Sequence, residues 1–403
     1  MVMKAVAQAG RKGSDVRSDC WVQIELRDTG GIEVNVKSKV QAMYGESIER
    51  LAKKMMKACK VPHAIVNIED YGAVPFVLMA RIETALRRAD ANFGESYLPE
   101  MKSWSEYEST RTRFRRSRLY LPGNEPKFML NAGLHKPDGV ILDLEDSVPN
   151  AEKDAAAVLV RNALRQVNFY GAERMVRINQ LPGGLDDIDY IAQHNTHVIL
   201  IPKCESADHV RAVDDKVTDI CGSSHSVLYM PILESAKGIL HAYEIATAAK
   251  NIVALTIGLE DYTADIGTQR TAEGKESLWA RSMVVNAARA AGIQPIDTVF
   301  SDVSDMDGLR RSVIEARSLG FDGKGCIHPR QIDVIHEAFA PDDVEIARAR
   351  KIVLAFEEAE AKGLGVVSLG SKMIDPPVVK RALHTVDLAV ATNKLKANWR
   401  DES

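Results

Sequence analysis

Two apolar stretches of the chain end abruptly in carboxylates, at Glu234 and at Asp261. The stretches, 229–233 and 253–257, read as parallel strands buried on both faces, because such strands are continuously apolar. In barrels of parallel strands the chemistry gathers at the C-terminal rim. A hard divalent cation such as Mg²⁺ accepts one or two carboxylates plus substrate oxygens. The pattern therefore predicts Glu234 and Asp261 as metal ligands; the structural alternative is a helix cap at Glu234 and an arginine partner for Asp261.

Charged and amide side chains also stand at the ends of the other predicted strands of this region. They are Arg116, Asn124, Glu145, Asp146, Arg177, Asn179, Lys203, Glu260, Asp302 and His328. A rim with a purely structural role does not need charge at nearly every strand end, so the set indicates an anionic substrate and a cation. Arg177 is the best candidate for gripping a carboxylate, because its planar guanidinium binds one bidentately. The structural alternative is an ion pair between Arg177 and Glu145 or Asp146.

The elements that position these side chains alternate between strand and helix patterns. Strands are expected at 118–121, 139–144, 175–178, 198–202, 229–233, 253–257, 295–299 and 320–327. Helices are expected at 151–165, 185–193, 207–220, 236–249, 278–291 and 306–318. Eight strands with helical crossovers predict an α/β fold, a (β/α)₈ TIM barrel. A doubly wound open sheet is the alternative, but no Gly-x-Gly-x-x-Gly follows the first strand to support a dinucleotide site.

The first hundred residues predict a separate, small α+β unit. Its expected elements are strands at 21–26, 32–36 and 64–69 and helices at 47–59 and 75–88. The first two strands alternate apolar and polar side chains on either side of the turn Asp28–Gly31, which predicts a β-hairpin. The unit contains no acid–base or metal cluster, so its chemistry cannot be read from spacing alone. A polar, charged stretch at 99–114 predicts a linker to the barrel.

Length and composition narrow the class of protein. The 403 residues suit two domains, and 45% hydrophobic with 27% charged residues is ordinary for a globular chain. A net charge of -4 gives no reason to expect a nucleic-acid partner. The 5 cysteines are scattered, which favours a reducing compartment over a disulfide framework. Without a secretory signal or a run of about 18 apolar residues, the expected location is the cytoplasm, with no membrane contact.

The rim motifs together carry a resemblance to the beta subunit of citrate lyase. The matching segments, in the same order, are Arg115–Asn124, Leu142–Val148, Val176–Asn179, Ile201–Lys203, Ile232–Gly238, Gly258–Tyr262, Phe321–Lys324, Cys326–Gln331 and Gly370–Asp375. That subunit belongs to the Mg²⁺-dependent citrate lyase/malyl-CoA lyase superfamily of TIM barrels. The motifs are specific for the superfamily and less decisive between its citryl and malyl branches.

This resemblance implies a retro-Claisen reaction, in which a citryl thioester gives oxaloacetate and an acetyl thioester. It implies Mg²⁺ at Glu234 and Asp261, and Arg177 holding a carboxylate of the oxaloacetate half. Further substrate contacts are expected from Arg116, Lys203, Asn179 and Glu234. Glu145, Asp146 and a residue of a neighbouring subunit are the candidates for proton transfer, and geometry must decide among them.

The amino-terminal unit resembles the acyl carrier (gamma) subunit of citrate lyase. The resemblance rests on the polar turn at 10–20, on Glu69–Ala73 and on the Arg-rich helix 80–88. In that family a serine of the first turn carries a phosphoribosyl-dephospho-coenzyme A arm. The turn departs from the family pattern, because it has two Ser-Asp pairs and lacks the preceding glutamate. Ser14 is the preferred attachment point and Ser18 the alternative; a turn in which neither serine is modified also fits.

The two resemblances together predict a fusion of carrier and lyase. The expected limits are 1–98 for the carrier-like domain, 99–114 for the linker, 115–390 for the barrel and 391–403 for a C-terminal tail. The expected partners are the citrate lyase alpha subunit, a CoA-transferase, and further copies of this chain. The alternatives are a stand-alone malyl-, citramalyl- or citryl-CoA lyase with a vestigial carrier domain, and a non-catalytic carrier or assembly protein.

Overall fold

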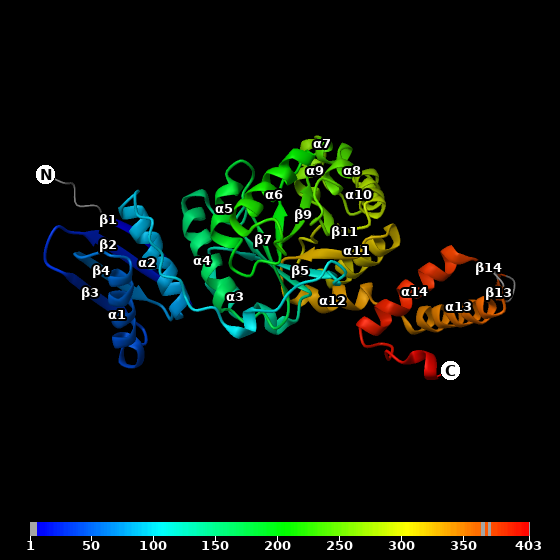
Figure 1. The fold of residues 1–403 in the computed structure, drawn as a ribbon, viewed down its shortest axis with the longest axis horizontal. Helices are drawn as coiled ribbons and strands as arrows, with labels where there is room; N and C mark the ends of the chain where they lie inside the picture. Colours follow the sequence, from blue (N-terminus) through cyan, green and yellow to red (C-terminus); the bar gives the residue numbers. More distant parts are fainter. Residues whose placement is uncertain (1–5, 364–366, 370–371, 403) are drawn as a thin grey trace.

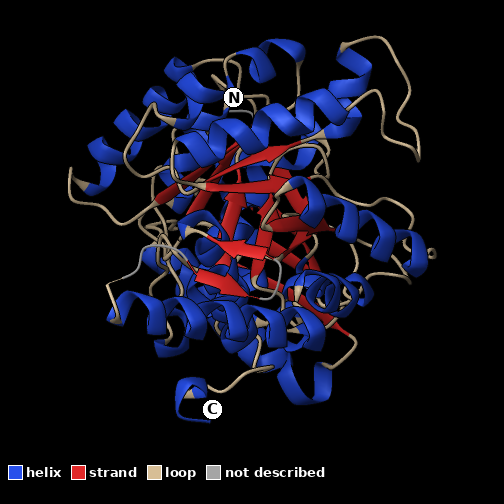
Figure 2. Ribbon diagram, turned by 90° about the vertical axis from the view of Figure 1, so that its right-hand side faces the viewer, coloured by secondary structure: helices blue, strands red, loops and turns tan. Residues whose placement is uncertain are grey.

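A closed barrel of eight parallel strands forms the centre of the molecule, with helices around it (Figures 1 and 2). The computed structural model describes residues 6–363, 367–369 and 372–402. The barrel strands are β5 (Ser117–Pro122), β6 (Gly139–Asp143), β7 (Glu173–Arg177), β8 (Val198–Ile201), β9 (Leu228–Leu233), β10 (Ala254–Ile257), β11 (Gln294–Asp297) and β12 (Gly323–Cys326). Each pairs with its neighbours in sequence, and β12 pairs with β5 to close the ring. The predicted (β/α)₈ barrel is therefore confirmed.

The helices between the strands follow the predicted pattern with three additions and one break. They are α3 (Pro126–Met129), α4 (Lys153–Gln166), α5 (Gly184–Ile191), α6 (Ala207–Cys221), α7 (Ala236–Leu240), α8 (Ala242–Ala246), α9 (Leu259–Asp265), α10 (Leu278–Ala290), α11 (Met306–Leu319) and α12 (Arg330–Phe339). The single helix predicted at 236–249 is broken at His241, between α7 and α8. The additions α3 and α9 are too short to show a helical period, whereas α12 buries Ile332, Ile335 and Phe339 on one face, a period that the prediction missed.

Two apolar layers hold the barrel together. Side chains that point inward, among them Ile141, Met175 and Ile232, form the interior cluster. The outward side chains of the same strands join the helices in a much larger cluster. Both faces of the strands are thus apolar, which explains the continuous apolar runs in the sequence. Polar side chains are accommodated mainly at the two ends of the barrel.

The first domain is a four-stranded sheet covered by two helices. Its elements are β1 (Val6–Gly10), β2 (Cys20–Leu26), β3 (Ile32–Ser38), α1 (Gln41–Ala58), β4 (Ala64–Asp70) and α2 (Pro75–Ala89). The predicted hairpin of 21–26 with 32–36 is wrong, because the strand order is β1-β2-β4-β3. β4 lies between the two, antiparallel to β2 and parallel to β3. Alternation shows that a strand is half-buried and says nothing about its neighbour.

The first domain docks on the barrel through helices α2 and α4 (Figure 1). Phe76 and Val77 belong to the apolar cluster that also contains the inward face of α4. Beside them Arg161 binds buried Glu83 bidentately, at 2.6 and 3.0 Å. Asn162 Nδ2 donates to the Phe76 carbonyl at 3.1 Å. A junction that mixes apolar packing with buried ion pairs fixes the first domain against the barrel.

We expect the substitution Arg161→Ala to destabilise the protein by roughly 2–4 kcal/mol, because Glu83 would remain buried with Arg87 as its remaining ion-pair partner. The measurement is the denaturant midpoint, with Lys53→Ala as the control, since Lys53 forms an exposed pair with Glu49. The double change Arg161→Met with Glu83→Gln should recover most of the loss. Equal midpoints for wild type and Arg161→Ala would show that this pair does not anchor the domain.

The stretch predicted as a linker runs across the amino-terminal face of the barrel as a hydrogen-bonded strap. Lys102 N donates to the Arg165 carbonyl at 3.0 Å, and Trp104 Nε1 donates to that of Gln166 at 3.0 Å. Further along, Arg115 binds Glu173 bidentately at 2.7 and 2.8 Å, with both side chains buried. The stretch therefore adds to the fixed attachment of the first domain.

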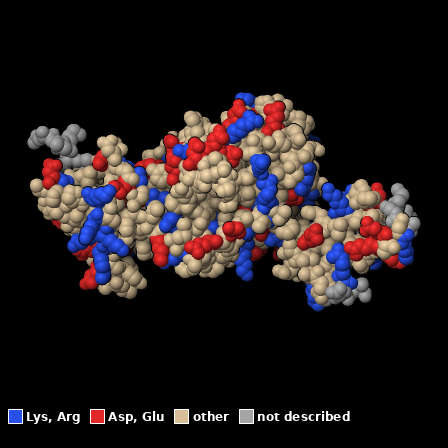
Figure 3. Space-filling model, viewed as in Figure 1, with Lys and Arg blue, Asp and Glu red and all other residues tan. Residues whose placement is uncertain are grey.

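Beyond the barrel the chain forms an extension with its own apolar cluster. It contains α13 (Asp343–Ala361), β13 (Val367–Leu369), β14 (Lys372–Ile374) and α14 (Pro376–Ala391). The motif Gly370–Asp375 lies partly outside the described residues, and the predicted domain limits stay a prediction. In the described part of the chain, no helix is long and apolar enough to cross a membrane. Figure 3 shows both signs of charge interspersed over the barrel, with basic side chains gathered on part of the first domain.

Candidate active site

Five of the predicted site residues meet at the carboxyl end of five consecutive barrel strands. They are Glu145, Arg177, Lys203, Glu234 and Asp261, which follow or end β6, β7, β8, β9 and β10 in that order. The contacts among them include Arg177 with Glu145 at 2.7 Å, Lys203 with Asp261 at 3.3 Å and Lys203 with Glu145 at 4.0 Å. The structure thus brings these residues into one site at the mouth of the barrel.

Arg177 is held by an acidic partner that the sequence analysis missed. Its Nε and Nη2 donate to the two carboxylate oxygens of Asp143 at 2.6 and 2.7 Å. Burial disfavours ionisation of Asp143, but Arg177 outweighs it, so the pKa of Asp143 lies below its usual range. The predicted alternative is also present, because Arg177 Nη1 lies near Glu145 and Asp146. The one signal for Asp143 was its place at the end of a buried run.

Glu234 is the more buried of the two predicted metal ligands, with 6% of its surface exposed. Its Oε2 accepts a hydrogen bond from Lys203 N at 2.9 Å. On the neighbouring strand, a Cβ added at Gly258 would lie 2.5 Å from Glu234 Oε1. A side chain at position 258 would therefore displace the carboxylate, and the glycine is needed for close approach rather than for a turn.

The carboxylates of the site are crowded. Burial, with Glu145 and Asp261 nearby, raises the pKa of Glu234 to about 8. Burial and Asp146 raise the pKa of Glu145 to about 7, although Arg177 opposes the shift. Lys203 is shared between Asp261 and Glu145. Arg177 and Lys203 together do not offset the carboxylates of Asp143, Glu145, Asp146, Glu234 and Asp261, so the site favours a further cation.

The donor set fits a hard divalent cation that also takes substrate or water oxygens. Among the described residues, no three His, Cys, Asp or Glu side chains are gathered closely enough to hold a metal by themselves. Mg²⁺ commonly binds through one or two carboxylates and keeps its other positions for water and substrate. Glu234 directly follows β9, and Asp261 lies in the first turn of α9, behind the adjacent strand β10, so both are suited to that partial role.

The raised pKa values predict a pH dependence of stability in the presence of EDTA. The folded state binds protons at Glu234 and Glu145 more tightly than the unfolded chain does, so both groups oppose folding as pH rises from about 4.5 to 8. We expect wild-type protein to lose about 2–5 °C more in melting temperature than Glu234→Gln between pH 5.5 and 8.5. Adding Mg²⁺ should remove the difference. An equal change in melting temperature between pH 5.5 and 8.5 for the two proteins would contradict the prediction.

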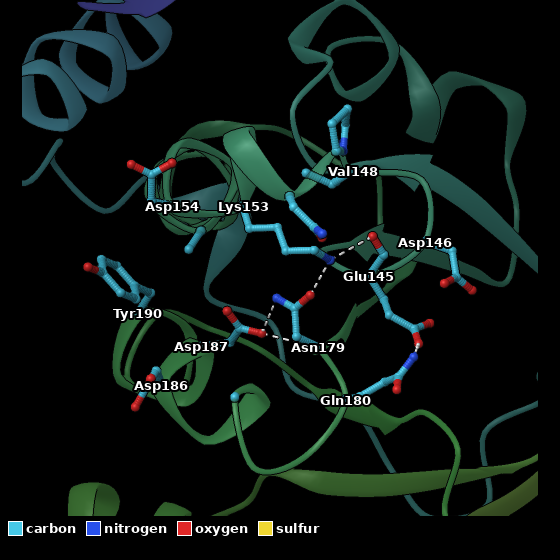
Figure 4. A pocket seen from close by; sticks show the side chains of 14 residues that line it. Glu145, Asp146, Val148, Lys153, Asp154, Asn179, Gln180, Asp186, Asp187 and Tyr190 are labelled. Carbon is cyan, nitrogen blue, oxygen red and sulfur yellow. Dashed lines mark hydrogen bonds between the residues drawn. The ribbon is translucent and has the colours of Figure 1, made fainter. Parts of the chain in front are cut away.

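A cavity of about 800 Å³ opens beside the carboxylates, between α4 and α5 (Figure 4). Lys153 reaches across it and donates to the Glu145 carbonyl at 3.0 Å and to Asn179 Oδ1. Asn179 N and Nδ2 donate to Asp187 at 2.7 and 2.9 Å. Both the oxygen and the nitrogen of the Asn179 amide are therefore hydrogen-bonded within the protein. The residue connects Lys153 to Asp187 in the wall of the cavity and has no amide group free for substrate. The predicted substrate contact from Asn179 is not supported by this arrangement.

Several predicted rim residues do not join this group of side chains. Arg116 precedes β5 and binds Asp138 bidentately, at 2.8 Å for both contacts, on the amino-terminal face. Arg116 stands at the start of its strand, and the rim is at the other end, so this placement does not support the predicted substrate contact, which stays a prediction. Glu260 points outward to Arg270 at 2.7 Å. Asp302 and His328 accept hydrogen bonds from backbone N–H groups of their own loops.

The first domain presents its polar turn to the rim. Arg11 Nη1 is paired with Glu125, just after β5, and Arg81 Nη2 donates to the Asn124 carbonyl at 3.2 Å. Within the turn, Ser14 is exposed and donates to the neighbouring Asp15 at 3.2 Å. Ser18 is partly buried and has a left-handed backbone with a φ of 57°. Of the two candidate serines, Ser14 is the more accessible.

Comparison with known proteins finds two family models along the chain. The model described as HpcH/HpaI aldolase/citrate lyase matches residues 116–329. The model described as malonate decarboxylase delta subunit matches residues 4–89. The first covers more than half of the chain, and the second covers the small domain.

Curated relatives and solved structures agree with the first model. Citrate lyase subunit beta of Leuconostoc mesenteroides subsp. cremoris is 40% identical over 290 residues, 70% of this chain and 95% of the relative. Mitochondrial citramalyl-CoA lyase of Mus musculus is 32% identical over 310 residues, 73% of this chain and 91% of the relative. The crystal structure of protein CitE from Mycobacterium tuberculosis in complex with magnesium, acetoacetate and coenzyme A matches with a TM-score of 0.59 and 29% identity, over 70% of this chain and 99% of that one.

Proposed function

Because this chain belongs to the HpcH/HpaI aldolase/citrate lyase family, we propose that it is a carbon–carbon lyase that cleaves a citryl thioester to oxaloacetate and an acetyl thioester. The observation that carries the proposal is the meeting of Arg177, Lys203, Glu145, Glu234 and Asp261 at the barrel mouth. It supplies cationic groups for an anionic substrate and uncompensated carboxylates for Mg²⁺. The relative crystallised with magnesium and a keto acid supports the same ligand classes.

The reaction breaks a C–C bond, removes the hydroxyl proton and leaves the electron pair on the thioester as an enolate, which is then protonated at carbon. Glu234 and Asp261 would hold Mg²⁺, which when bound would supply the positive charge that acidifies and orients the hydroxyl. Arg177 is fixed by Asp143, and its Nη1, which contacts Glu145 at 2.7 Å, would be shared with a substrate carboxylate. Glu145 has a pKa of about 7 and so exchanges a proton readily at neutral pH. We assign Glu145 the proton transfer in preference to Asp146, whose side chain is half-exposed.

The test is release of oxaloacetate from citryl-CoA by the purified chain, with and without Mg²⁺. Metal-dependent release with little turnover of malyl-CoA or citramalyl-CoA is the expected result. Preference for one of those two esters would place the chain in the other branch of the family, to which the citramalyl-CoA lyase relative belongs. A protein that binds Mg²⁺ and cleaves none of the three esters would instead support a carrier or assembly role.

We further propose that the first domain carries a phosphoribosyl-dephospho-coenzyme A arm on Ser14. The carrier-type family match supports an arm on this domain, and the exposure of Ser14, three residues after Arg11, supports this assignment over Ser18. The expected result is an added mass on the intact protein from its native host, which the variant Ser14→Ala lacks and Ser18→Ala retains. The same added mass on Ser14→Ala would move the site to Ser18, and an unmodified wild type would leave the domain without an arm.

The fixed docking of the first domain bears on how such an arm works. The turn is already held at the rim through Arg11 and Arg81, so the arm swings while the domain stays in place. A tether of suitable reach raises the effective concentration of the thioester at the barrel mouth. We propose a CoA-transferase, the citrate lyase alpha subunit, as the partner that loads the arm, and assembly with further copies of this chain. Turnover of free citrate by this chain alone would contradict the need for that partner.

A further inference from the structure

A buried arginine crosses the interior of the barrel below the site. Arg118 lies on β5, has no exposed surface, and its Nη1 reaches Met230 Sδ at 3.0 Å and Thr256 Oγ1 at 3.1 Å. Met230 is on β9, the strand diametrically opposite β5 in the ring of eight. The residues paired with Arg118 on the flanking strands are Gly139 and Gly325. Neither contributes a side chain to this layer, which leaves the long guanidinium room to cross it.

Arg118 carries a charge that its surroundings do not neutralise. Within the described residues it forms no ion pair, and its Nε is buried without a hydrogen-bond partner. Among the other buried arginines, Arg81, Arg115, Arg177 and Arg281 each bind a carboxylate. Arg174, which has no carboxylate partner among the described residues, instead donates to the backbone carbonyls of Asn195 and Tyr107. Burying an unpaired charge is costly, and an apolar side chain would fit the surrounding cluster of Ile, Met and Leu. A structural role does not account for a cation here.

The cation lies directly under the proposed ligand site. Arg118 precedes Tyr120 by two residues, roughly 7 Å along the strand. The Tyr120 ring in turn lies 5.3 Å below the Arg177 guanidinium. Thr256, on β10, precedes by two residues Gly258, at which an added Cβ would meet Glu234. The layer of Arg118 is therefore separated from the carboxylates and Arg177 by about one layer of side chains.

We infer that Arg118 is a specificity-determining residue, an interior cation that strengthens binding of multiply charged anions at the barrel mouth and weakens binding of cations. The inference rests on the proposed function, in which the mouth takes Mg²⁺ and a dicarboxylic keto acid. A charge in a poorly solvated interior acts over a longer distance than one at the surface, because neither water nor salt screens it. Arg118 acts on the ligands through this field, without touching them.

The test compares wild type with Arg118→Met and, as a second neutral variant, Arg118→Gln, using the full chain and titration calorimetry. The probes are Mg²⁺ alone, then oxalate, a dianion, and pyruvate, a monoanion, at saturating Mg²⁺. Both variants are expected to bind Mg²⁺ roughly three- to tenfold more tightly and oxalate roughly three- to tenfold more weakly, with a smaller loss for pyruvate. Arg118→Lys keeps the charge and should restore wild-type values.

The expected changes in affinity have opposite signs for Mg²⁺ and for oxalate. This distinguishes an electrostatic effect from structural damage, which would weaken the binding of both ligands. Folding should not suffer in Arg118→Met, because an apolar side chain replaces an unpaired buried charge. Affinities that fall together, or that stay within twofold of wild type for Mg²⁺ and oxalate, would overturn the inference while leaving the lyase proposal intact. A wild-type protein that binds neither Mg²⁺ nor oxalate would overturn both.

Discussion

Replacing Glu234 with glutamine is expected to lower oxaloacetate release from citryl-CoA by roughly a thousandfold at saturating Mg²⁺. Glutamine keeps the shape of the side chain and can still accept the hydrogen bond from Lys203 N. It removes the negative charge, which leaves Asp261, a half-exposed carboxylate already paired with Lys203, as the remaining predicted ligand. The Mg²⁺ affinity, measured by calorimetry, should fall together with the rate.

The control for this substitution is Glu260→Gln, one residue before Asp261. Glu260 is exposed and paired with Arg270, outside the group of carboxylates. It should keep at least half of the wild-type rate, because a surface ion pair contributes little. If Glu234→Gln retains a tenth of the wild-type activity, Glu234 is neither a metal ligand nor a proton-transfer group, because the loss of either role costs more than tenfold.

Replacing Arg177 with lysine is expected to reduce kcat/KM by roughly a hundredfold or more. Lysine keeps the positive charge but loses the planar fork that binds Asp143 with one edge and is proposed to present the other to substrate. Much of the loss should be a higher KM, because a carboxylate contact is weakened. Steady-state kinetics and a melting curve together separate this effect from unfolding.

Arg116→Lys is the matched control, because Arg116 also binds one aspartate bidentately, at the opposite face of the barrel. We expect it to lower the melting temperature and to leave kcat and KM within about twofold of wild type. A large rise of KM in Arg116→Lys would support the original prediction that Arg116 binds substrate. Equal activity of Arg177→Lys and wild type would remove Arg177 from the site.

Much of this molecule follows from the sequence because local patterns are enough. Apolar runs at regular spacing identified all eight barrel strands, and their order around the ring is the order along the chain. The carboxyl ends of parallel strands must share one rim, so polar residues at those ends had to come close together. The positions of Glu145, Arg177, Lys203, Glu234 and Asp261 along the chain are therefore enough to predict that they share one site.

Only the tertiary structure decided which strands pair and which side chains bind one another. Residues that are far apart along the chain but adjacent in the fold leave no signal in the local sequence pattern. The pairing of β3 with β4 instead of β2, and the hold of Asp143 on Arg177, depend on which strands lie side by side. Arg116 directly precedes β5, and the length of that one strand separates it from the carboxyl end. It therefore lies on the opposite face of the barrel from the site. Arg118 carries the same formal charge as Arg116, yet the inward direction of its side chain makes it an unpaired cation in the barrel interior. The sequence determines which residues are charged and with which sign. The folded structure determines whether each charge has a partner of opposite sign.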